Sequence, residues 1–349
     1  MKCESKDFGL NVKGEAVVAY TLTNDIGASI TVLNYGGIIQ SLIVPDRNGK
    51  LENVVLGLNS TEEYDQFSPF YGCITGRTAG RISNAAFTIE DNTFTLEAND
   101  GTNNLHGGPD GLDKRIWDVT EIIGKDYGEL ALNYTSPHMD QGFPGTLDMV
   151  VTYKFDDDNR LTITYKATTD QPTILTLTNH SYFNLSGDPT TTVLDHELQL
   201  PVDKIVVIDE KSIPVAVVPV DDGPFDFRKG KAIGQDIDAD DLNIKNGSGY
   251  DHPFVLNKEA DEVIRLHDPK SGRIMTMTTS EQCVVCYTAN FLGAEMYAYD
   301  KKPLQSRGAV CLETQYYPNA INADFIPERI LRPGEVYLES TTIKFSIEE

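Results

Sequence analysis

Strand patterns recur along nearly the whole chain. Residues 161–167 alternate apolar and polar side chains with a period of two, and residues 336–347 do the same near the end. This period places successive side chains on opposite faces of a β-strand. Turn signals separate such runs, at Asn48-Gly49, Asp100-Gly101, Asn246-Gly247 and in the acidic stretch 156–159. The chain is therefore predicted to be built mainly of strands.

Helix signals, by contrast, are few and short. Ser60 and Glu63 resemble a capping box, which predicts a helix of one or two turns over residues 61–66. The sequence has no fixed-period repeat, so a propeller or solenoid is not expected. No Pro/Gly/Ser-rich linker divides it. Many turn-separated strands without crossover helices predict an all-β fold, a large antiparallel β-sandwich with few short helices, formed as one domain over residues 1–349.

The charge balance restricts the class of partner. There are 29 Lys and Arg residues against 53 Asp and Glu, a formal net charge of −24. Such acidity keeps a protein soluble, and it disfavours nucleic acid, anionic lipid and polyanionic substrates. A neutral small molecule is the natural ligand. No run of about 18 apolar residues is present, so no membrane-spanning helix is predicted.

Cysteine usage bears on location. The five cysteines, an odd number without a framework spacing, are Cys3, Cys73, Cys283, Cys286 and Cys311. This usage favours a reduced compartment, and we expect a cytoplasmic protein. The single Cys-x-x-Cys pair has no second pair or nearby histidines, so we interpret it as structural. The first residues lack a signal-peptide pattern. Cys3 leaves open a periplasmic or lipid-anchored protein whose signal was trimmed.

The segment 173–187 is the strongest functional signal. Leu175 and Leu177 alternate with threonines, and the run then ends in a polar and aromatic cluster made of Asn179, His180, Ser181, Tyr182 and Asn184. Such a mixture suits the hydroxyl edges and C–H faces of a carbohydrate. Histidine can also exchange a proton near neutral pH. The alternative is a core strand whose polar groups are satisfied by neighbouring backbone.

Four more segments interrupt the strand pattern with polar groups. They are residues 76–81 with Arg77 and Arg81, 103–108 with Asn103 and His106, 249–254 with Asp251, and 310–319 with Glu313 and Gln315. Each has a structural alternative: a salt-bridged arginine, an incidental loop histidine, a hydrogen-bonding turn and an exposed strand face.

The last of these segments supplies a candidate base. Val310 and Leu312 point to one side of a strand, so Glu313 and Gln315 face the other. A partly apolar surround could raise the pKa of the Glu313 carboxyl and make it a better base. The five segments together hold the parts for general acid–base chemistry on a polyol. They show neither a nucleophile elbow nor a short metal-binding histidine spacing, so no metal is expected.

The motifs resemble those of the aldose 1-epimerase (galactose mutarotase) family over essentially the whole chain. The similar segments are Gly-Arg-Thr-Ala-Gly-Arg-Ile (76–82), Asn-Asn-Leu-His-Gly-Gly (103–108), Thr-Asn-His-Ser-Tyr-Phe-Asn-Leu (178–185), Asp-His-Glu-Leu (195–198), Pro-Phe-Asp-Phe-Arg (224–228), Gly-Tyr-Asp-His (249–252), Leu-Glu-Thr-Gln (312–315) and Leu-Arg-Pro-Gly-Glu-Val-Tyr (331–337). The resemblance implies a large antiparallel sandwich with a sugar cleft, and interconversion of the α and β anomers of free aldohexoses such as galactose and glucose.

The resemblance also implies roles. Glu313 would be the general base and His180 the general acid, and the sugar-binding candidates are Arg77, His106, Asp251, Asn103, Gln315 and Tyr182. The family uses no cofactor and no required metal, and a monomer or weak homodimer is the simplest expectation. Two departures from the family pattern bear on specificity. Gly80 stands where the family often has Asn, and Pro253, after Asp251-His252, stands where the family often has a different residue.

Three alternatives to the mutarotase interpretation are considered. A hexose-6-phosphate mutarotase would need a cluster of basic side chains near the motifs, where only Arg77 and Arg81 stand. A carbohydrate-binding protein without activity would have no need of an acid and a base. A glycoside hydrolase would use two carboxylates, Glu313 and Asp251, and would leave the His180 segment without a role.

Overall fold

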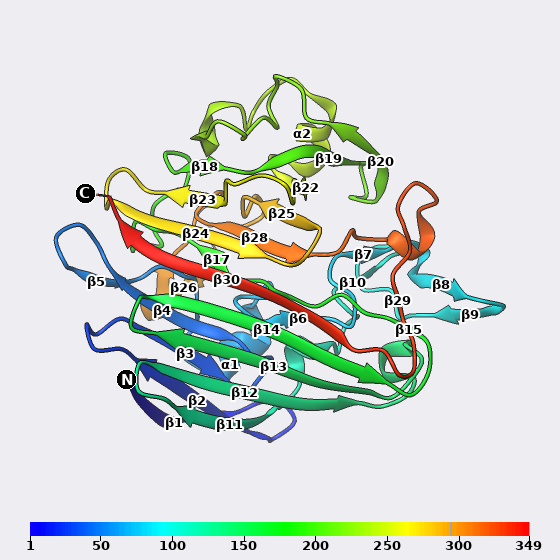
Figure 1. Ribbon diagram of the computed structural model, residues 1–349, viewed down its shortest axis with the longest axis horizontal. Coiled ribbons are helices and arrows are strands. Elements are labelled where there is room, and N and C mark those ends of the chain that lie inside the picture. Colours follow the sequence, from blue (N-terminus) through cyan, green and yellow to red (C-terminus); the bar gives the residue numbers. More distant parts are fainter. Residues whose placement is uncertain (294, 349) are drawn as a thin grey trace.

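Antiparallel sheets dominate the regular structure of the computed structural model, which describes residues 1–293 and 295–348 (Figure 1). The largest sheet has nine strands and runs across one whole face of the molecule. In spatial order its strands are β11 (Asp118–Ile123), β12 (Tyr127–Ser136), β13 (Leu147–Asp156), β14 (Arg160–Thr169), β30 (Tyr337–Ile347), β24 (Arg273–Thr279), β23 (Ile264–His267), β18 (Glu197–Gln199) and β21 (Lys231–Ala232).

Two smaller sheets lie behind it. The first contains β1 (Lys2–Leu10), β2 (Ala16–Thr23), β3 (Ser29–Leu33), β4 (Ile39–Pro45) and β5 (Leu51–Asn53). The second has the order β17 (Tyr182–Phe183), β28 (Val310–Gln315), β25 (Cys283–Tyr287), β22 (Asp251–Leu256), β19 (Val202–Ile208) and β20 (Pro214–Pro219). This six-stranded sheet carries Tyr182, Asp251, Glu313 and Gln315 of the candidate site.

The remaining elements are short. Two-stranded pairs are formed by β6 (Ile74–Thr75) with β16 (Thr178–Asn179), β7 (Arg81–Ile82) with β10 (Asn104–Leu105), β8 (Ala86–Ile89) with β9 (Asn92–Thr95), β15 (Thr173–Ile174) with β29 (Ile330–Leu331), and β26 (Tyr297–Ala298) with β27 (Lys302–Pro303). The α-helices of the described chain are α1 (Thr61–Phe67) and α2 (Leu242–Gly247). Neither approaches the length and apolar character that a membrane-crossing helix needs.

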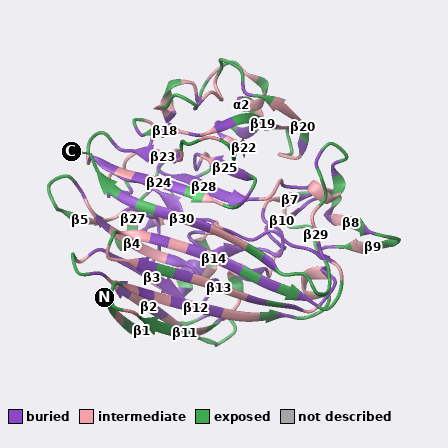
Figure 2. Ribbon diagram, viewed as in Figure 1, coloured by how far each residue is buried: buried purple, intermediate pink, exposed green. Residues whose placement is uncertain are grey.

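One hydrophobic core joins the three sheets into a sandwich. It contains Leu42 of β4, Val151 of β13 and Phe254 of β22, among many others. Along β13 and β14 buried side chains alternate with more exposed ones, as Figure 2 shows, because one face of the sheet packs on this core and the other meets solvent. The predicted all-β antiparallel sandwich with few short helices is confirmed.

Of three local predictions, one helix forms as expected, one turn is replaced by a helix end, and one strand is divided in two. The helix at 61–66 forms as α1, and the Ser60 side chain accepts a hydrogen bond from Glu63 N at 3.3 Å. The turn predicted at Asn246-Gly247 is instead the end of α2, because Asp241 caps that helix at its start. The alternating run from residue 173 is divided between β15 and β16, which pair with two different partners, β29 and β6. A local cap decides the outcome at Asn246-Gly247, and long-range pairing decides the division of the strand.

Candidate active site

The floor of a cleft is built by one face of the six-stranded sheet. Glu313 of β28 lies opposite Val285 of β25, and Val285 lies opposite Pro253 of β22. Two residues further along, Tyr287 pairs with Asp251 in the same way. Residues directly opposite in adjacent strands share a face of the sheet. Three strands far apart in sequence therefore project Glu313 and Asp251 into the same space.

The other face of these strands belongs to the core. Leu312, Val284 and Phe254 alternate with the cleft residues and are buried in the main hydrophobic cluster. The alternation predicted for residues 310–315, with Glu313 and Gln315 opposite the apolar side chains, is what the register shows. Apolar packing on one face thus holds the polar side chains of the other face in place.

The cleft also takes residues from the loops at the edge of the sheet. Its empty volume, which includes the open solvent at its mouth, is about 920 Å³. The lining residues are Pro69, Phe70, Gly80, Arg81, Leu105, His106, His180, Tyr182, Ile208, Ser212, Pro214, Asp251, Pro253, Val285, Tyr287, Phe291, Glu313, Gln315 and Pro318. Apolar and aromatic walls surround a small group of convergent polar side chains.

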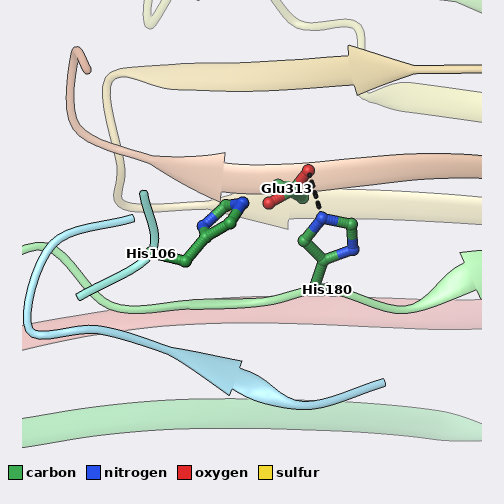
Figure 3. A group of neighbouring side chains, drawn as sticks. All are labelled: His106, His180 and Glu313. Atoms are coloured by element: carbon green, nitrogen blue, oxygen red, sulfur yellow. Dashed lines mark ion pairs between the residues drawn. The ribbon is translucent and has the colours of Figure 1, made fainter. Parts of the chain in front are cut away.

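At the centre of the cleft, His180 faces Glu313. His180 follows β16, and its Nε2 lies 3.5 Å from Glu313 Oε1 (Figure 3). Both side chains are buried. The imidazole ring lies nearly parallel to the rings of Tyr182 and Phe70, with centroids 5.0 Å and 5.8 Å away. These neighbours fix the orientation of the ring.

Burial shifts the protonation of this pair away from two charged groups. Desolvation lowers the pKa of His180 to about 4. Desolvation, followed by the nearby charge of Asp251, raises the pKa of Glu313 well above its usual value, and Arg81 opposes that rise. A resting pair of imidazolium and carboxylate would be the simplest expectation for an acid and a base. Burial instead favours the neutral pair, with the shared proton on Glu313.

His106 is held on the other side of the carboxylate (Figure 3). It follows β10, and its Nδ1 accepts a hydrogen bond from Gly80 N at 3.2 Å while its own backbone N donates to Gly80 O. A neutral imidazole has one donor and one acceptor nitrogen. Because Nδ1 accepts, the ring proton lies on Nε2. Burial lowers the pKa of His106 well below its usual value, so the ring is a neutral donor.

Asp251 and Arg81 complete the polar lining. Burial raises the pKa of Asp251 to about 6. Arg81 Nε binds Asp100 Oδ2 at 2.7 Å, which fixes the arginine at the cleft wall. Its two terminal nitrogens make no hydrogen bond to the residues that the structure describes, so they remain for a ligand. A guanidinium can bind two neighbouring oxygens at once.

Arg77 does not belong to the cleft, although it was a sugar-binding candidate. Its buried guanidinium donates to Ser136 Oγ, Ser136 O, Pro137 O and Pro144 O at 2.8–3.0 Å. These partners use its donors within the protein. Arg81, four residues later in the same motif, takes the place at the cleft. The geometry favours Arg81 over Arg77, the arginine to which the resemblance gave the sugar-binding role.

The three remaining candidates lie in different settings. Asn103 is buried outside the cleft lining, and its Oδ1 accepts a hydrogen bond from Asn84 N, so it shapes a loop. Tyr182 lines the cleft with its ring, but its hydroxyl donates to Pro69 O at 2.9 Å. Gln315 lines the cleft in the same row as Glu313. Gln315 can therefore contact a ligand, and Tyr182 acts mainly through packing.

Several lining residues escaped the sequence analysis. Tyr287 and Phe291 stack on each other at the cleft wall, and Ile208, Ser212 and Pro214 come from the β19–β20 hairpin. They are ordinary strand and turn residues, with no polar cluster around them. Only the pairing of β22 with β25 and of β19 with β20 brings them to the cleft.

One group of donor atoms has spacing that could hold a metal. In residues 1–293 and 295–348, His106, His180 and Glu313 offer ligand atoms within 4.8 Å of one another. The Gly80 hydrogen bond leaves the proton of His106 on Nε2, so that nitrogen has no lone pair for a metal. Cys283 and Cys286 lie an odd number of positions apart in β25, on opposite faces, and cannot close on one ion. The donor set suits proton transfer better than metal binding.

Comparison with known proteins agrees with this fold, an antiparallel sandwich. A sequence model of the aldose 1-epimerase family matches residues 18–344. The chain is 36% identical to galactose mutarotase of Rattus norvegicus over 96% of this chain and 95% of the relative. It is 34% identical to aldose 1-epimerase of Escherichia coli (strain K12), over 96% and 97% of the two chains.

Solved structures extend the likeness to three dimensions. The structure of galactose 1-epimerase from Lactobacillus acidophilus NCFM superposes with a TM-score of 0.89 and 28% identity, and the match covers 100% of both chains. The fold and cleft therefore define an isomerase of the mutarotase type. The chain belongs to the aldose 1-epimerase family, as the motifs of its sequence predict, and it is an enzyme.

Proposed function

We propose that the cleft interconverts the α and β anomers of a free aldohexose, with Glu313 as general base and His180 as general acid. The reaction type follows from the family to which the chain belongs, and the assignment of roles to residues is our inference. The observation that carries it is the buried contact between His180 Nε2 and Glu313 Oε1 at 3.5 Å, on the polar floor of an otherwise apolar cleft. A sugar is recognised by the groups around this pair.

The chemistry needs two proton transfers. Glu313 removes the proton from the anomeric hydroxyl while His180 donates one to the ring oxygen, and the C1–O5 bond opens. The aldehyde then rotates about C1–C2 and recloses on its other face with the roles reversed. Each positioned proton transfer contributes a factor of roughly 10²–10⁴. No covalent intermediate is required.

The shifted pKa values fit this cycle. Ring opening starts from imidazolium and carboxylate and ends with neutral imidazole and protonated Glu313, which is the form that recloses the ring. Both forms carry one proton, so they differ only in its position. Burial favours the neutral form. In the empty cleft the charged pair that opens the ring therefore lies above the neutral pair in energy, and the neutral pair is the form that recloses the open-chain sugar.

The surrounding groups are assigned to sugar binding. Arg81, His106 and Asp251 donate to or accept from hydroxyls, Gln315 adds an amide, and the rings of Phe70 and Tyr287 cover C–H faces. Among the described lining residues Arg81 is the one Lys or Arg. A phosphorylated sugar would need more positive charge than this, so a neutral hexose is the better substrate.

The decisive experiment follows the optical rotation of freshly dissolved α-galactose and α-glucose. The wild type should accelerate the decay, and Glu313→Gln and His180→Asn should each lower kcat/KM by at least about 10²-fold. Sugar titrations followed by NMR should still show binding. Near-wild-type turnover in Glu313→Gln would overturn the assignment. A wild type that binds sugar without changing the decay would identify a binding protein, and strong competition by a hexose 6-phosphate would favour the phosphosugar alternative.

Location and assembly are part of the same proposal. Cys3, Cys73, Cys283, Cys286 and Cys311 are all free thiols, which supports a reduced compartment such as the cytoplasm. A monomer or weak homodimer is proposed as the simplest assembly. Sedimentation at several protein concentrations tests the assembly.

A further inference from the structure

Both ring nitrogens of His180 face side chains of a single strand, β28. Nε2 lies 3.5 Å from Glu313 Oε1, and Nδ1 lies 3.6 Å from Cys311 Sγ. Cys311 and Glu313 are two residues apart, so their side chains project from the same face of the strand. The strand therefore contacts the imidazole at both ends, with a carboxylate at one nitrogen and a thiol at the other.

The ring has little freedom to escape this contact. His180 N donates to Cys73 O at 2.9 Å, and His180 O accepts from Gly72 N at 3.0 Å, so the backbone is fixed on both sides. Tyr182, which pairs with Cys311 across β17 and β28, lies nearly parallel to the imidazole at 5.0 Å. Rotation of the ring would break both nitrogen contacts at once.

Nδ1 needs a hydrogen-bond acceptor throughout the proposed reaction. Nε2 faces Glu313, so it is the nitrogen that gains and loses the proton. Nδ1 keeps its hydrogen in the imidazolium, in the neutral ring that remains after donation, and in the resting pair, where Nε2 accepts from protonated Glu313. Among the described residues, the side-chain atom within hydrogen-bond distance of Nδ1 is Cys311 Sγ.

A thiol is an unusual partner for this nitrogen. Nδ1 of a functional histidine commonly donates to a backbone carbonyl or a carboxylate, which stabilises the imidazolium. Sulfur is a weak acceptor. Burial, followed by the charge of Glu313, raises the pKa of the Cys311 thiol well above its usual value, so it stays neutral. The thiol can therefore hold the ring without making the imidazolium a weaker acid.

We propose that Cys311 is a positioning residue for His180: its sulfur accepts the Nδ1 hydrogen bond, aims Nε2 at the reacting sugar and keeps the imidazolium acidic by giving Nδ1 a weak, uncharged side-chain partner. This inference rests on the proposed role of His180 as the acid. The other titratable groups packed around the ring are Glu313, His106, Tyr182, Tyr287 and Cys73.

The chain offers a matched control in Cys286. This cysteine lies in the neighbouring strand β25, opposite Leu312, and is equally buried. Its side chain points to the other face of the sheet, into the hydrophobic core. Substitutions of Cys286 therefore cost packing in the same sheet without touching His180.

Cys311→Ala, Cys311→Ser and the same two changes at Cys286 would be compared with the wild type. In Cys311→Ala, kcat should fall about tenfold at unchanged KM, because the ring is less well aimed. In Cys311→Ser the hydroxyl is a stronger acceptor. The ascending limb of kcat/KM against pH should then move up by about 0.5 to 1 pH unit. The Cys286 variants should leave kcat unchanged, and both limbs of the profile of kcat/KM against pH should stay at the wild-type positions.

A second readout reports the proton directly. In protein with ¹⁵N-labelled histidine, His180 of the wild type should show a protonated Nδ1 over the neutral pH range, with its signal assigned by comparison with His180→Asn. Cys311→Ala should shift this signal towards the Nε2–H tautomer. This measurement needs only folded protein, which the Cys311→Ser variant supplies if Cys311→Ala folds poorly.

Two results would overturn the inference: an Nε2–H tautomer in the wild type, or Cys311 variants that match the Cys286 variants in kcat, pH limbs and ¹⁵N signals. Either result, together with inactive Glu313→Gln, would leave the acid–base assignment intact and remove only the role of Cys311. Active Glu313→Gln would instead remove the proposed function itself.

Discussion

Two buried glutamates in this protein have opposite surroundings. Glu281, just before β25, accepts two hydrogen bonds from Arg329 Nη1 at 3.1 and 3.0 Å and one from the Tyr337 hydroxyl at 3.1 Å. Glu313, in the middle of β28, is equally buried. No residue in 1–293 or 295–348 donates a hydrogen bond to its carboxylate, and its near neighbour is His180 Nε2 at 3.5 Å.

The difference separates structural from chemical use of a buried acid. An ionised carboxylate taken out of water is costly unless it is paired and hydrogen-bonded. Glu281 meets that requirement within the protein through Arg329 and Tyr337, which oppose the rise that burial causes in its pKa, and these contacts fasten β30 and the segment before β29 to the sheet. Glu313 does not, so its unmet hydrogen bonds are available to a sugar hydroxyl, and its basicity is raised by the same burial.

The largest effect expected from this comparison is on stability at Glu281. Glu281→Gln should remove the charged partner of Arg329 Nη1, leave Arg329 paired, among the described residues, only with Glu339, and lower the free energy of unfolding by about 1–3 kcal/mol. Chemical denaturation measures this loss, which should come with near-normal kcat/KM. Glu313→Gln should instead lose kcat/KM while its free energy of unfolding stays close to that of the wild type. If both variants lost mainly stability, the contrast would be broken.

The two arginines of residues 76–82 repeat the contrast. Arg81→Ala should lower kcat/KM by about 10- to 100-fold, since a charge-assisted hydrogen bond to the sugar is lost, with little change in Tm. Arg77→Ala should lower Tm instead, because it leaves the carbonyl groups of Ser136, Pro137 and Pro144 without their donor. Thermal denaturation and polarimetry on the same preparations give both values. Reduced affinity for sugar in stable Arg77→Ala protein would contradict this division.

The pH profile tests the electrostatics of the cleft. In the free enzyme, the active form carries one proton between His180 and Glu313. As pH rises, the doubly protonated form loses its first proton near the lowered pKa of His180, about 4, and kcat/KM should rise there. It should fall again when the pH passes the raised pKa of Glu313. The two limbs belong to the coupled pair. A profile with a single limb would count against the assignment.

The smallest effect is expected at Asp251. Asp251→Asn should raise KM by up to about tenfold with a smaller change in kcat, because the residue binds the sugar and takes no proton from it. The nearby negative charge of Asp251 raises the pKa of Glu313, so its removal should also move the descending limb to lower pH. Initial-rate polarimetry across pH gives both readouts. A collapse of kcat at constant KM would place Asp251 in the chemistry.

Much of this architecture could be predicted from local patterns. Period-two alternation and turn residues predicted the all-β sandwich, and the capping pattern at Ser60 placed α1. Alternation also placed Glu313 and Gln315 opposite the core face of β28, because the period of a strand is a purely local property. The polar cluster after residue 178 marked His180 for the same reason: it departs from the pattern of its own strand.

Other features depend on contacts between distant segments. Arg77 and Arg81 stand in one short motif with similar neighbours. Only the positions of Ser136 and Asp100 decide which guanidinium spends its hydrogen-bond donors on the protein itself and which keeps donors for a ligand. Likewise, nothing local marked Cys311, because the contact of its sulfur with His180 joins residues 131 positions apart. The sequence by itself determined the strands, their faces and the reactive residue types. The tertiary structure decided which of those residues share the cleft, because sheet register and burial are set by long-range packing.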